Sequence, residues 1–375
     1  MTSLPTRVVQ AVRPQASSGV MAGAAVVAAT FAATPFLLPN VSERLSVDIG
    51  ATGLMSVAQV GSFAIASFLA GRLLRPRRRF HYGALAIIAV ATAASALVTS
   101  FPVLLACRAV SGLGMGTLTW IAWADATRFP RGMGDVAAVA PVTATIASPI
   151  LGWLVELGGY PVVFGVLATV ALLAAVFPVD FGDLPRIGRN VGGSRSNRVL
   201  LGTLLILSVG GSSVFIFTAA AGQALHGLTP VTVSWGFSLN AIAGVVATRR
   251  TAGKRAAAIW LTATALSALV VGVVSSAAVF FLALTLWGFA FWMAVPAVLK
   301  MLAARSLHPS ERMGDAQAAM AAGRVLGPLV GGVALGGGQF GRLSVVGSSI
   351  IMISALTVGV VEWYRAGLPV PGTDA

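Results

Sequence analysis

Long apolar segments alternate with short polar connections from one end of the chain to the other. Each apolar segment approaches the ~20 residues that an α-helix needs to cross the hydrocarbon core of a bilayer. The pattern predicts twelve spans, at residues 18–39, 51–73, 82–99, 101–126, 134–156, 160–178, 199–222, 230–248, 256–275, 277–304, 313–336 and 343–364. We therefore expect an all-α membrane protein with twelve transmembrane helices.

The composition supports this reading and argues against a soluble enzyme. Of the 375 residues, 57% are hydrophobic and only 10% are charged, too few to cover a water-facing surface. The one cysteine, Cys107, falls inside a predicted span, so no disulfide framework or cysteine metal site is expected. No catalytic cluster stands at a shared depth. We expect no enzyme activity, no cofactor and no metal.

The basic residues are distributed unevenly between the two sides of the predicted membrane. If the N-terminus is cytoplasmic, the outer connections hold only Arg44 and Arg342, and the other connections hold the basic clusters. Cytoplasmic loops are enriched in Lys and Arg, so both termini are predicted to be cytoplasmic in a plasma (inner) membrane. The net charge of +14 is therefore assigned to anionic lipid headgroups rather than to nucleic acid. The basic N-terminal segment is predicted to precede a retained first helix rather than a cleaved signal peptide.

Two halves of six spans are separated by the longest inner connection. Residues 179–198 are rich in Gly, Pro, Ser and charge and predict a cytoplasmic linker between an N-terminal bundle, 1–178, and a C-terminal bundle, 199–375. The sequence RGMGD at 131–135 returns as ERMGD at 311–315, and SPILGW at 148–153 corresponds to GPLVGG at 327–332. These offsets of 179 to 180 residues indicate duplicated, pseudo-symmetric bundles, which are typical of transporters.

Three local patterns then give a family resemblance. They are GRLLRPRRR at 71–79, LLACRAVSGLGMG at 104–116, and a G-x8-G-x3-G-P-x2-G-G pattern through residues 314–332. With the six-plus-six organisation, they resemble the major facilitator superfamily over essentially the whole chain. The resemblance implies alternating access around a cavity lined by helices 1, 4, 7 and 10. It also implies a gate near Arg72, although Gly71 stands where the family pattern has an acid. The third pattern resembles an exporter-associated motif of helix five but stands on helix eleven.

Two arginines fall inside predicted spans. Arg324 is about eleven residues into its span, and Arg108 is about 10 Å from the outer end of the fourth helix at ~1.5 Å per residue. A charge at such depth costs at least ~2.5–3.5 kcal/mol and normally faces water or a partner. Both are candidates for binding an anionic group of a solute. The alternative for Arg108 is a structural role in which it binds backbone carbonyls.

The segment around Arg324 combines small residues with a proline. Gly323, Gly327 and Gly331 recur every four residues and predict a smooth ridge for close helix packing. Pro328 cannot donate a hydrogen bond to the carbonyl of Arg324, so it leaves that acceptor free. Gln317 lies on the same helix face as Arg324 and extends a polar strip.

Aromatic and polar residues supply further candidates for solute contact. The aromatic candidates are Trp120, Trp287, Phe291 and Trp292, with lipid-facing tryptophan as the alternative. The polar candidates are Thr34, Gln59 and Asn240, with hydrogen bonding between helices as the alternative. Asp125, at the exit of the fourth helix, is expected to form a loop or gate salt bridge with a basic residue.

The sequence thus predicts a secondary transporter of a small organic solute, with export of a drug-like molecule or a metabolite as the leading interpretation. An organic-anion carrier that uses Arg108 and Arg324 is the second candidate, and a non-transporting assembly factor or sensor is the third. Coupling to H⁺ or Na⁺ stays open, because no Asp, Glu or His stands at the centre of a span. We expect a monomer.

Overall fold

The computed structural model describes residues 16–126, 128, 132–181, 195–250, 256–304 and 309–364, and this part is helical. In the first half the helices are α2 (Ser18–Arg44), the 3₁₀ turn η1 (Ala51–Gly53), α3 (Leu54–Leu73), α4 (Arg78–Leu97), α5 (Phe101–Ala126), α6 (Gly132–Gly158) and α7 (Tyr160–Ala174). In the second half they are α8 (Arg195–Phe215), α9 (Thr218–His226), α10 (Pro230–Thr248), α11 (Ala257–Val273), α12 (Ala277–Ala303), α13 (Pro309–Leu335) and α14 (Phe340–Tyr364).

Ten helical segments in the described residues are long and apolar enough to cross a membrane. Two shorter apolar helices, α7 with 15 residues and α11 with 17, occupy the sixth and ninth predicted spans. At 1.5 Å per residue they reach only about 22 and 26 Å, less than the ~30 Å hydrocarbon core. An all-α membrane protein is thus supported, and the count of twelve crossings stays a prediction.

The seventh predicted span, 199–222, lies within one membrane-spanning segment, Asn197–His226, whose helix is interrupted. Helix α8 ends at Phe215 and α9 begins at Thr218. Between them Phe217 has φ −97° and ψ 2°, outside the α-helical region, and its N–H bonds the carbonyl of Val214 only three residues back. This tight turn interrupts the α-helical ladder because the regular bond reaches four residues back.

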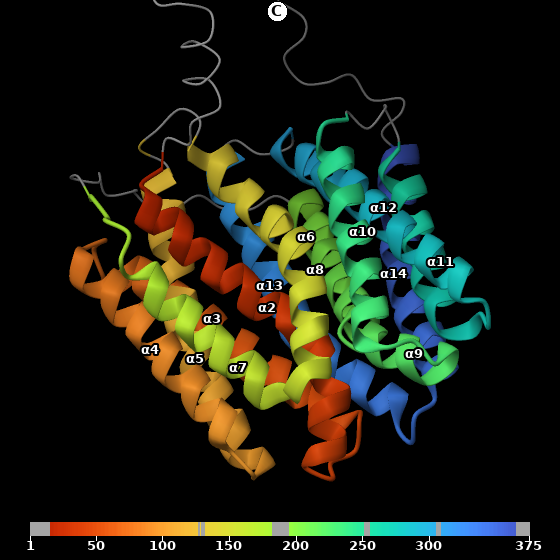
Figure 1. The fold of residues 1–375 in the computed structure, drawn as a ribbon. Helices are drawn as coiled ribbons and strands as arrows, with labels where there is room; N and C mark the ends of the chain where they lie inside the picture. Colours follow the sequence, from red (N-terminus) through yellow and green to blue (C-terminus); the bar gives the residue numbers. More distant parts are fainter. Residues whose placement is uncertain are drawn as a thin grey trace, which may run out of the picture.

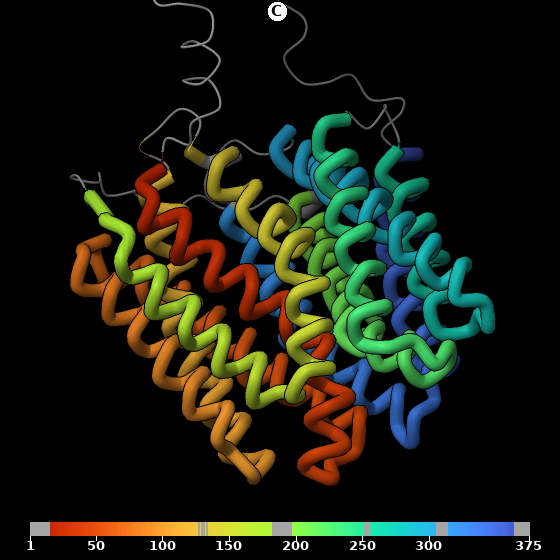
Figure 2. Tube along the Cα trace, viewed as in Figure 1, coloured from red at the N-terminus to blue at the C-terminus, as the bar shows by residue number. Residues whose placement is uncertain are grey.

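The helices form two groups that lie side by side (Figure 1). Helices α2 to α7, coloured red to yellow-green, make one group, and α8 to α14, coloured green to blue, make the other (Figure 2). Packing of α6 against α10 and of α3 against α13 joins them. The grouping agrees with the predicted bundles, whose boundaries stay a prediction.

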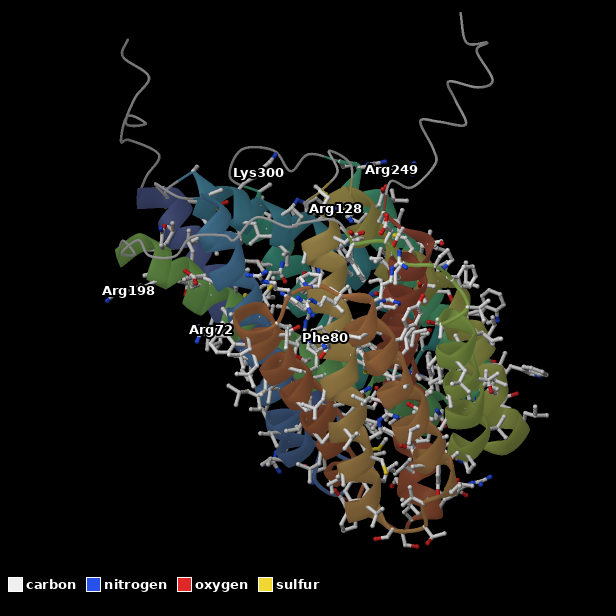
Figure 3. All side chains as sticks on the ribbon, turned by 90° about the vertical axis from the view of Figure 1, so that its left-hand side faces the viewer. Arg72, Phe80, Arg128, Arg198, Arg249 and Lys300 are labelled. Carbon is white, nitrogen blue, oxygen red and sulfur yellow. The ribbon has the colours of Figure 1, made fainter. Side chains whose placement is uncertain are left out.

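Basic side chains gather toward the end of the molecule where α2 begins and α14 ends. Figure 3 labels Arg72, Arg128, Arg198, Arg249 and Lys300 in the upper part of the molecule. Figure 1 shows that α2 begins and α14 ends at its top. We call the end where α2 begins and α14 ends the inner end, and the opposite end the outer end. The names follow the charge-based prediction that the inner end is cytoplasmic.

Each half carries an acidic residue that binds the start of a helix at the inner end. In the first half, Oδ1 of Asp180 lies 3.4 Å from Nη2 of Arg78, the first residue of α4. In the second half, Glu362 accepts hydrogen bonds from the backbone N–H groups of Ala257 (3.2 Å) and Ala258 (3.4 Å) at the start of α11. A carboxylate complements the positive end of a helix. The acids lie 182 residues apart and the helix starts 179 apart, which adds a structural counterpart to the repeat.

The surface of the helices is rich in large apolar side chains. Examples are Leu73, Leu97, Val333 and Trp363, each more than 70% exposed. Apolar area of this extent is unfavourable in water and matches the hydrocarbon environment that the sequence predicts.

Candidate functional site

The glycine ridge of α13 packs against α8. A Cβ on Gly323 would lie 2.5 Å from the carbonyl oxygen of Leu205, and one on Gly327 would lie 2.7 Å from that of Val209. A side chain on Gly331 would meet the backbone of Ser213. The ridge therefore holds two helices of the second half together, and a substituent larger than hydrogen has no room.

We expect Gly327→Leu to lower the stability of the protein. The new side chain would force α13 away from the backbone of α8, and overpacking of this kind costs about 1–3 kcal/mol. Thermal unfolding in detergent measures the effect. Gly314→Leu is the matched control, because a Cβ there would meet open space. Equal unfolding temperatures for the two variants would contradict the assigned packing.

A second face of α13 contacts the first half near the outer end. A Cβ on Gly332 would lie 2.5 Å from the carbonyl oxygen of Gly50, and one on Gly61 would lie 3.9 Å from Cγ1 of Val325. Pro328 reaches the same region, since its carbonyl oxygen would lie 3.1 Å from a Cβ on Gly53. From mid-helix to the outer end, α13 therefore closes against η1 and α3.

Helices α6 and α10 make another contact between the halves. The N–H of Val231 donates to Oε1 of Glu156 at 2.9 Å, and the hydroxyl of Ser238 donates to the carbonyl of Thr145 at 2.9 Å. Both hydrogen bonds lie between the middle of these helices and the outer end. Polar connections thus help to hold the outer side together.

A chain of edge-to-face aromatic rings also crosses from one half to the other. The ring of Phe36 on α2 lies 4.8 Å from that of Phe237 on α10. Phe237 lies 5.2 Å from Phe215 on α8, which lies 5.6 Å from Trp287 on α12. Trp287 is only 4% exposed. One predicted aromatic candidate, Trp287, therefore lies buried in the second half at the end of this chain of rings.

Arg324 lies on α13 between the two packed faces just described. Successive residues of a helix are ~100° apart, so Arg324 is turned about 100° from Gly323, which faces α8, and about 100° from Val325, which faces α3. The residues Leu326, Leu329 and Val333 lie on the opposite side and are exposed, as lipid-facing residues are. The side chain of Arg324 therefore projects toward the boundary between the halves rather than toward lipid.

Exposure along this strip of α13 changes with depth. Arg324 and Gln317 are exposed, whereas Pro328 and Leu335, further toward the outer end, are buried. The strip is thus open on the inner side and closed on the outer side. Gln317 lies seven residues from Arg324, about 10 Å along the helix.

Arg108 has different surroundings, inside the first half. It is 2% exposed, its Nη2 lies 3.3 Å from Oγ of Ser111, and its guanidinium stacks 4.7 Å from the ring of Phe164 on α7. Its Nη1 is buried without a hydrogen-bond partner in the described residues. The two candidate arginines thus occupy separate settings, one in the interior of a bundle and one at the boundary between bundles.

The polar candidates in the first half contact one another. Oγ1 of Thr34 donates to Oε1 of Gln59 at 3.4 Å, and Nε2 of Gln59 lies 3.0 Å from Sδ of Met115. Thr34 and Gln59 are both buried. This small network links α2, α3 and α5, which is the interhelical role weighed as the alternative to solute contact.

The remaining candidates pack at other helix contacts. A Cβ on Gly71 would lie 3.4 Å from the indole ring of Trp120, so α5 approaches α3 there. Trp292 fills the space at Gly244 of α10, and the ring of Phe291 lies 5.9 Å from that of Trp292. Nδ2 of Asn240 donates to the carbonyl of Leu284 on α12 at 2.8 Å. None of these contacts brings Trp120 together with Trp287 or Trp292, and their role in solute contact stays a prediction.

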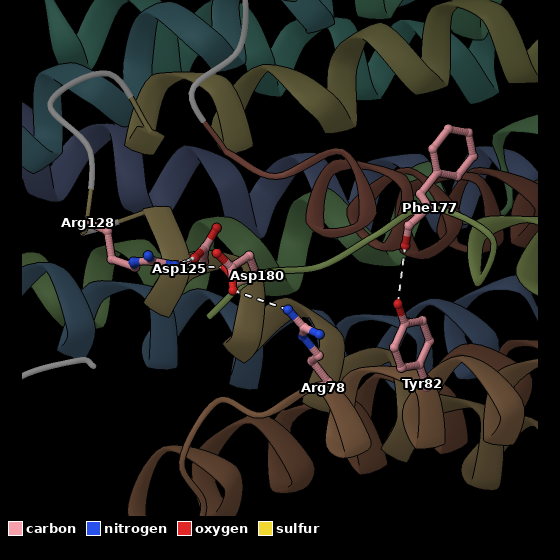
Figure 4. Close-up of polar contacts among 6 residues, drawn as sticks. All are labelled: Arg78, Tyr82, Asp125, Arg128, Phe177 and Asp180. Carbon is pink, nitrogen blue, oxygen red and sulfur yellow. Dashed lines mark hydrogen bonds and ion pairs between the residues drawn. The ribbon is translucent and has the colours of Figure 1, made fainter. Parts of the chain in front are cut away.

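The inner end of the first half contains a charged cluster (Figure 4). Oδ1 of Asp125 lies 2.8 Å from Nη1 of Arg128, which also donates to the carbonyl of Asp180 at 2.9 Å. Asp180 in turn pairs with Arg78. Asp125 therefore has the basic loop partner expected of it, and a gating role stays a prediction. Arg72 lies on the surface, with its guanidinium 3.6 Å from the ring centre of Phe68.

The carboxylates of Asp125 and Asp180 should contribute differently to the stability of the protein. Asp125 is fully buried, whereas the side chain of Asp180 is 85% exposed. We expect Asp125→Asn to destabilise the protein by about 1–3 kcal/mol, because it weakens a buried charge pair, and Asp180→Asn by at most about 0.5 kcal/mol. Thermal unfolding of the two purified variants measures the difference. A larger loss for Asp180→Asn would contradict this ranking.

Several contact residues were not anticipated from the sequence. Phe36 and Phe237, Glu156, and the pair Gly50 and Gly332 carry no pattern that distinguishes them from other aromatic, acidic or small residues at helix ends. Asp180 could have been suspected from its position, because Glu362 stands at the equivalent place of the second half.

Comparison with known proteins agrees with this architecture. The model of the Major Facilitator Superfamily matches residues 20–362. A chloramphenicol resistance protein of Streptomyces lividans is 27% identical over 246 residues, which cover 59% of this chain and 62% of that protein, so the match spans less than two thirds of that relative.

Two solved structures have the same fold at low sequence identity. A mutant of the nucleoside transporter NupG superposes with a TM-score of 0.71 at 14% identity, over 92% of this chain and 99% of its own. A bacterial homologue of the human lysosomal transporter Spinster, in an inward-facing and occupied conformation, gives 0.69 at 15% identity, over 97% and 96%. With the family model matching more than half of the residues, this chain belongs to the major facilitator superfamily.

Proposed function

We propose that this protein exports a small organic solute, such as a drug-like molecule or a metabolite, by alternating access. The observation that carries the proposal is the strip of α13 that is exposed at Arg324 and Gln317 and buried at Pro328 and Leu335. A transporter that opens to one side at a time needs a path that is open at one end and closed at the other.

The closed end is held by contacts that can separate without breaking either bundle. They are a glycine-to-glycine approach between Gly50 and Gly332, two hydrogen bonds to backbone groups between α6 and α10, and the rings of Phe36 and Phe237. The ion pairs of Asp125 and Asp180 lie at the inner end of the first half and do not lock this side. Interfaces of this kind support rocking of the halves, because little energy is stored in any single contact.

Two observations favour export. The relative from Streptomyces lividans is named for chloramphenicol resistance. In addition, the G-x8-G-x3-G-P-x2-G-G pattern resembles the exporter-associated pattern of the family, and its glycines at 323, 327 and 331 form the packed ridge of α13. The solute therefore enters from the inner side, to which the strip is open.

A second candidate is transport of an organic anion by Arg108 and Arg324. One observation favours it for Arg324, which is exposed at the boundary between the halves. Arg108 is enclosed in the first bundle and is better suited to a structural or coupling role. The third candidate, a membrane assembly factor or sensor that moves no solute, is an outcome of the experiment below.

The membrane, the oligomeric state and the energy source are proposed from the sequence. We propose that it is a multi-pass monomer in the plasma (inner) membrane, with its basic inner end against anionic headgroups. Coupling to H⁺ or Na⁺, as an antiporter, is proposed as the energy source. Its test is an imposed pH or Na⁺ gradient across vesicles that contain the purified protein.

Accumulation of solutes in cells tests the export proposal. Cells that express the protein are loaded with chloramphenicol and a panel of neutral, cationic and anionic drugs, and retained drug is compared with that in cells expressing the Gly332→Leu variant. We expect lower retention of at least one solute in the wild type only. Equal retention of every solute in both, at matched protein levels, would favour the third candidate.

A further inference from the structure

We propose that Arg324 and Gln317 form a binding strip for an organic anion, with the carboxylate or equivalent anionic group on Arg324. This inference rests on the proposed transport function and names the class of solute. Arg324 lies 15 residues after Pro309 and 11 before Leu335, the two ends of α13. Arg324 therefore lies in the middle third of the helix.

The side chain reaches this depth without a protein partner. Arg324 is exposed. Among the described residues it makes no ion pair and no hydrogen bond. Several carboxylates are engaged with other groups, namely those of Asp48, Asp125, Glu156, Asp180 and Glu362. Within the described part of the chain, no carboxylate neutralises Arg324.

An arginine in the middle of a membrane helix needs compensation for lost hydration. The cost on insertion scales is at least ~2.5 kcal/mol, which is why such residues face water or a partner. Arg324 does not face lipid, because the lipid-facing residues of α13 lie on the opposite side of the helix. An open strip between the halves supplies water in the empty transporter, and it leaves the donors of the guanidinium free for a solute.

The chemistry of the guanidinium selects the class of ligand. It is permanently charged and offers N–H donors in a planar fork that matches a carboxylate in two parallel hydrogen bonds. Pro328, four residues on, cannot donate to the carbonyl of Arg324, so that backbone oxygen lacks its regular helical donor. A solute with an anionic group and a nearby N–H or O–H donor can bind the guanidinium and this carbonyl oxygen together.

Gln317 extends the strip toward the inner end. Its side chain is exposed, and it is displaced from Arg324 by seven residues, about two helical turns or ~10 Å. An amide donates and accepts, so it suits a second polar group at the far end of the solute. The strip thus fits an elongated organic anion rather than a small inorganic ion.

A matched set of solutes tests the proposal. Benzoate, salicylate and indole-3-acetate are each compared with the corresponding uncharged amide, by thermal stabilisation of the purified protein and by flux into phosphatidylcholine proteoliposomes. The variants are Arg324→Gln, Arg324→Lys and, as the control, Arg342→Gln, which changes an exposed arginine at the outer end of α14. Vesicles with added phosphatidylglycerol distinguish a solute anion from an anionic lipid headgroup.

We expect the wild type and Arg342→Gln to prefer carboxylates over amides. Arg324→Gln should weaken carboxylate binding at least about tenfold, because a hydrogen bond to a charged group is lost, and leave amide binding unchanged. Arg324→Lys should keep part of the preference, since it keeps the charge without the fork. Partial rescue by lysine also shows that the loss in Arg324→Gln is not a folding defect.

Three results would overturn the proposal. One is equal binding of carboxylates and amides by the wild type. Another is an unchanged carboxylate preference in Arg324→Gln. The third is loss of the Arg324-dependent stabilisation when phosphatidylglycerol is present, with no flux of any carboxylate, which would assign the strip to a lipid. If chloramphenicol is still transported in these cases, the proposed export function stands and only the anion site fails.

Discussion

Oxidation of a Gly61→Cys/Val325→Cys variant should stop transport, and a reducing agent should restore it. A Cβ on Gly61 would lie 3.9 Å from Cγ1 of Val325. A small side-chain or backbone adjustment then brings two cysteines to the roughly 3.5–4.5 Å between Cβ atoms that a disulfide needs. The bond would tie α3 to α13 across the two halves. Because this contact must separate when the outer side opens, we expect solute flux to fall at least about tenfold.

The background for this experiment is simple to prepare. Cys107 is the only cysteine, so Cys107→Ser removes competing thiols. The matched controls are the two single-cysteine variants under the same oxidant, which should transport normally. Full transport by the oxidised double variant, with the cross-link verified by mass spectrometry, would mean that α3 and α13 stay in contact throughout the cycle. It would then be wrong that the two halves separate at this contact.

Gly332→Leu should have the second largest effect, by preventing closure of the outer side. Its side chain would project into the carbonyl of Gly50, which a Cβ alone would approach to 2.5 Å. Since backbone atoms of both halves would have to move apart, the outward-open state should be favoured. Transport should fall about tenfold or more. The state that is closed on the outer side and binds solute from the inner side would be rarely populated, and the apparent affinity for the solute falls in proportion to that population.

Labelling from the outside reads this shift directly. In a Cys107→Ser/Val325→Cys background, a membrane-impermeant thiol reagent should modify the thiol at position 325 faster when Gly332→Leu is present. Gly83→Leu is the matched control, because a Cβ on Gly83 meets nothing within 4 Å. Unchanged labelling together with normal unfolding temperature would show that the Gly50 and Gly332 contact does not control the outer side.

The fold was predictable because hydrocarbon imposes one simple requirement. Backbone groups in a bilayer must be satisfied internally, so runs of apolar residues become helices of predictable length. The break at Phe217 was not predictable, since apolar residues continue on both sides of it. Helices α7 and α11 end shortly before Pro178 and Ser275, and the sequence indicates these ends only approximately.

The candidate site was predictable in kind but not in arrangement. The ridge through Gly323, Gly327 and Gly331 was expected from its spacing, because close packing in membranes favours small residues at every fourth position. Its partner, α8, could not be read from the sequence. Arg108 and Arg324 had similar sequence signals, and only tertiary packing separates the enclosed one from the exposed one.

Solute flux into proteoliposomes that contain the purified protein tests the central claim most directly. We expect saturable flux of at least one small organic solute, faster than in protein-free vesicles and abolished in the oxidised Gly61→Cys/Val325→Cys variant. Flux that equals the protein-free rate for every neutral, cationic and anionic solute, with folded protein and with the pH and Na⁺ gradients imposed, would contradict it.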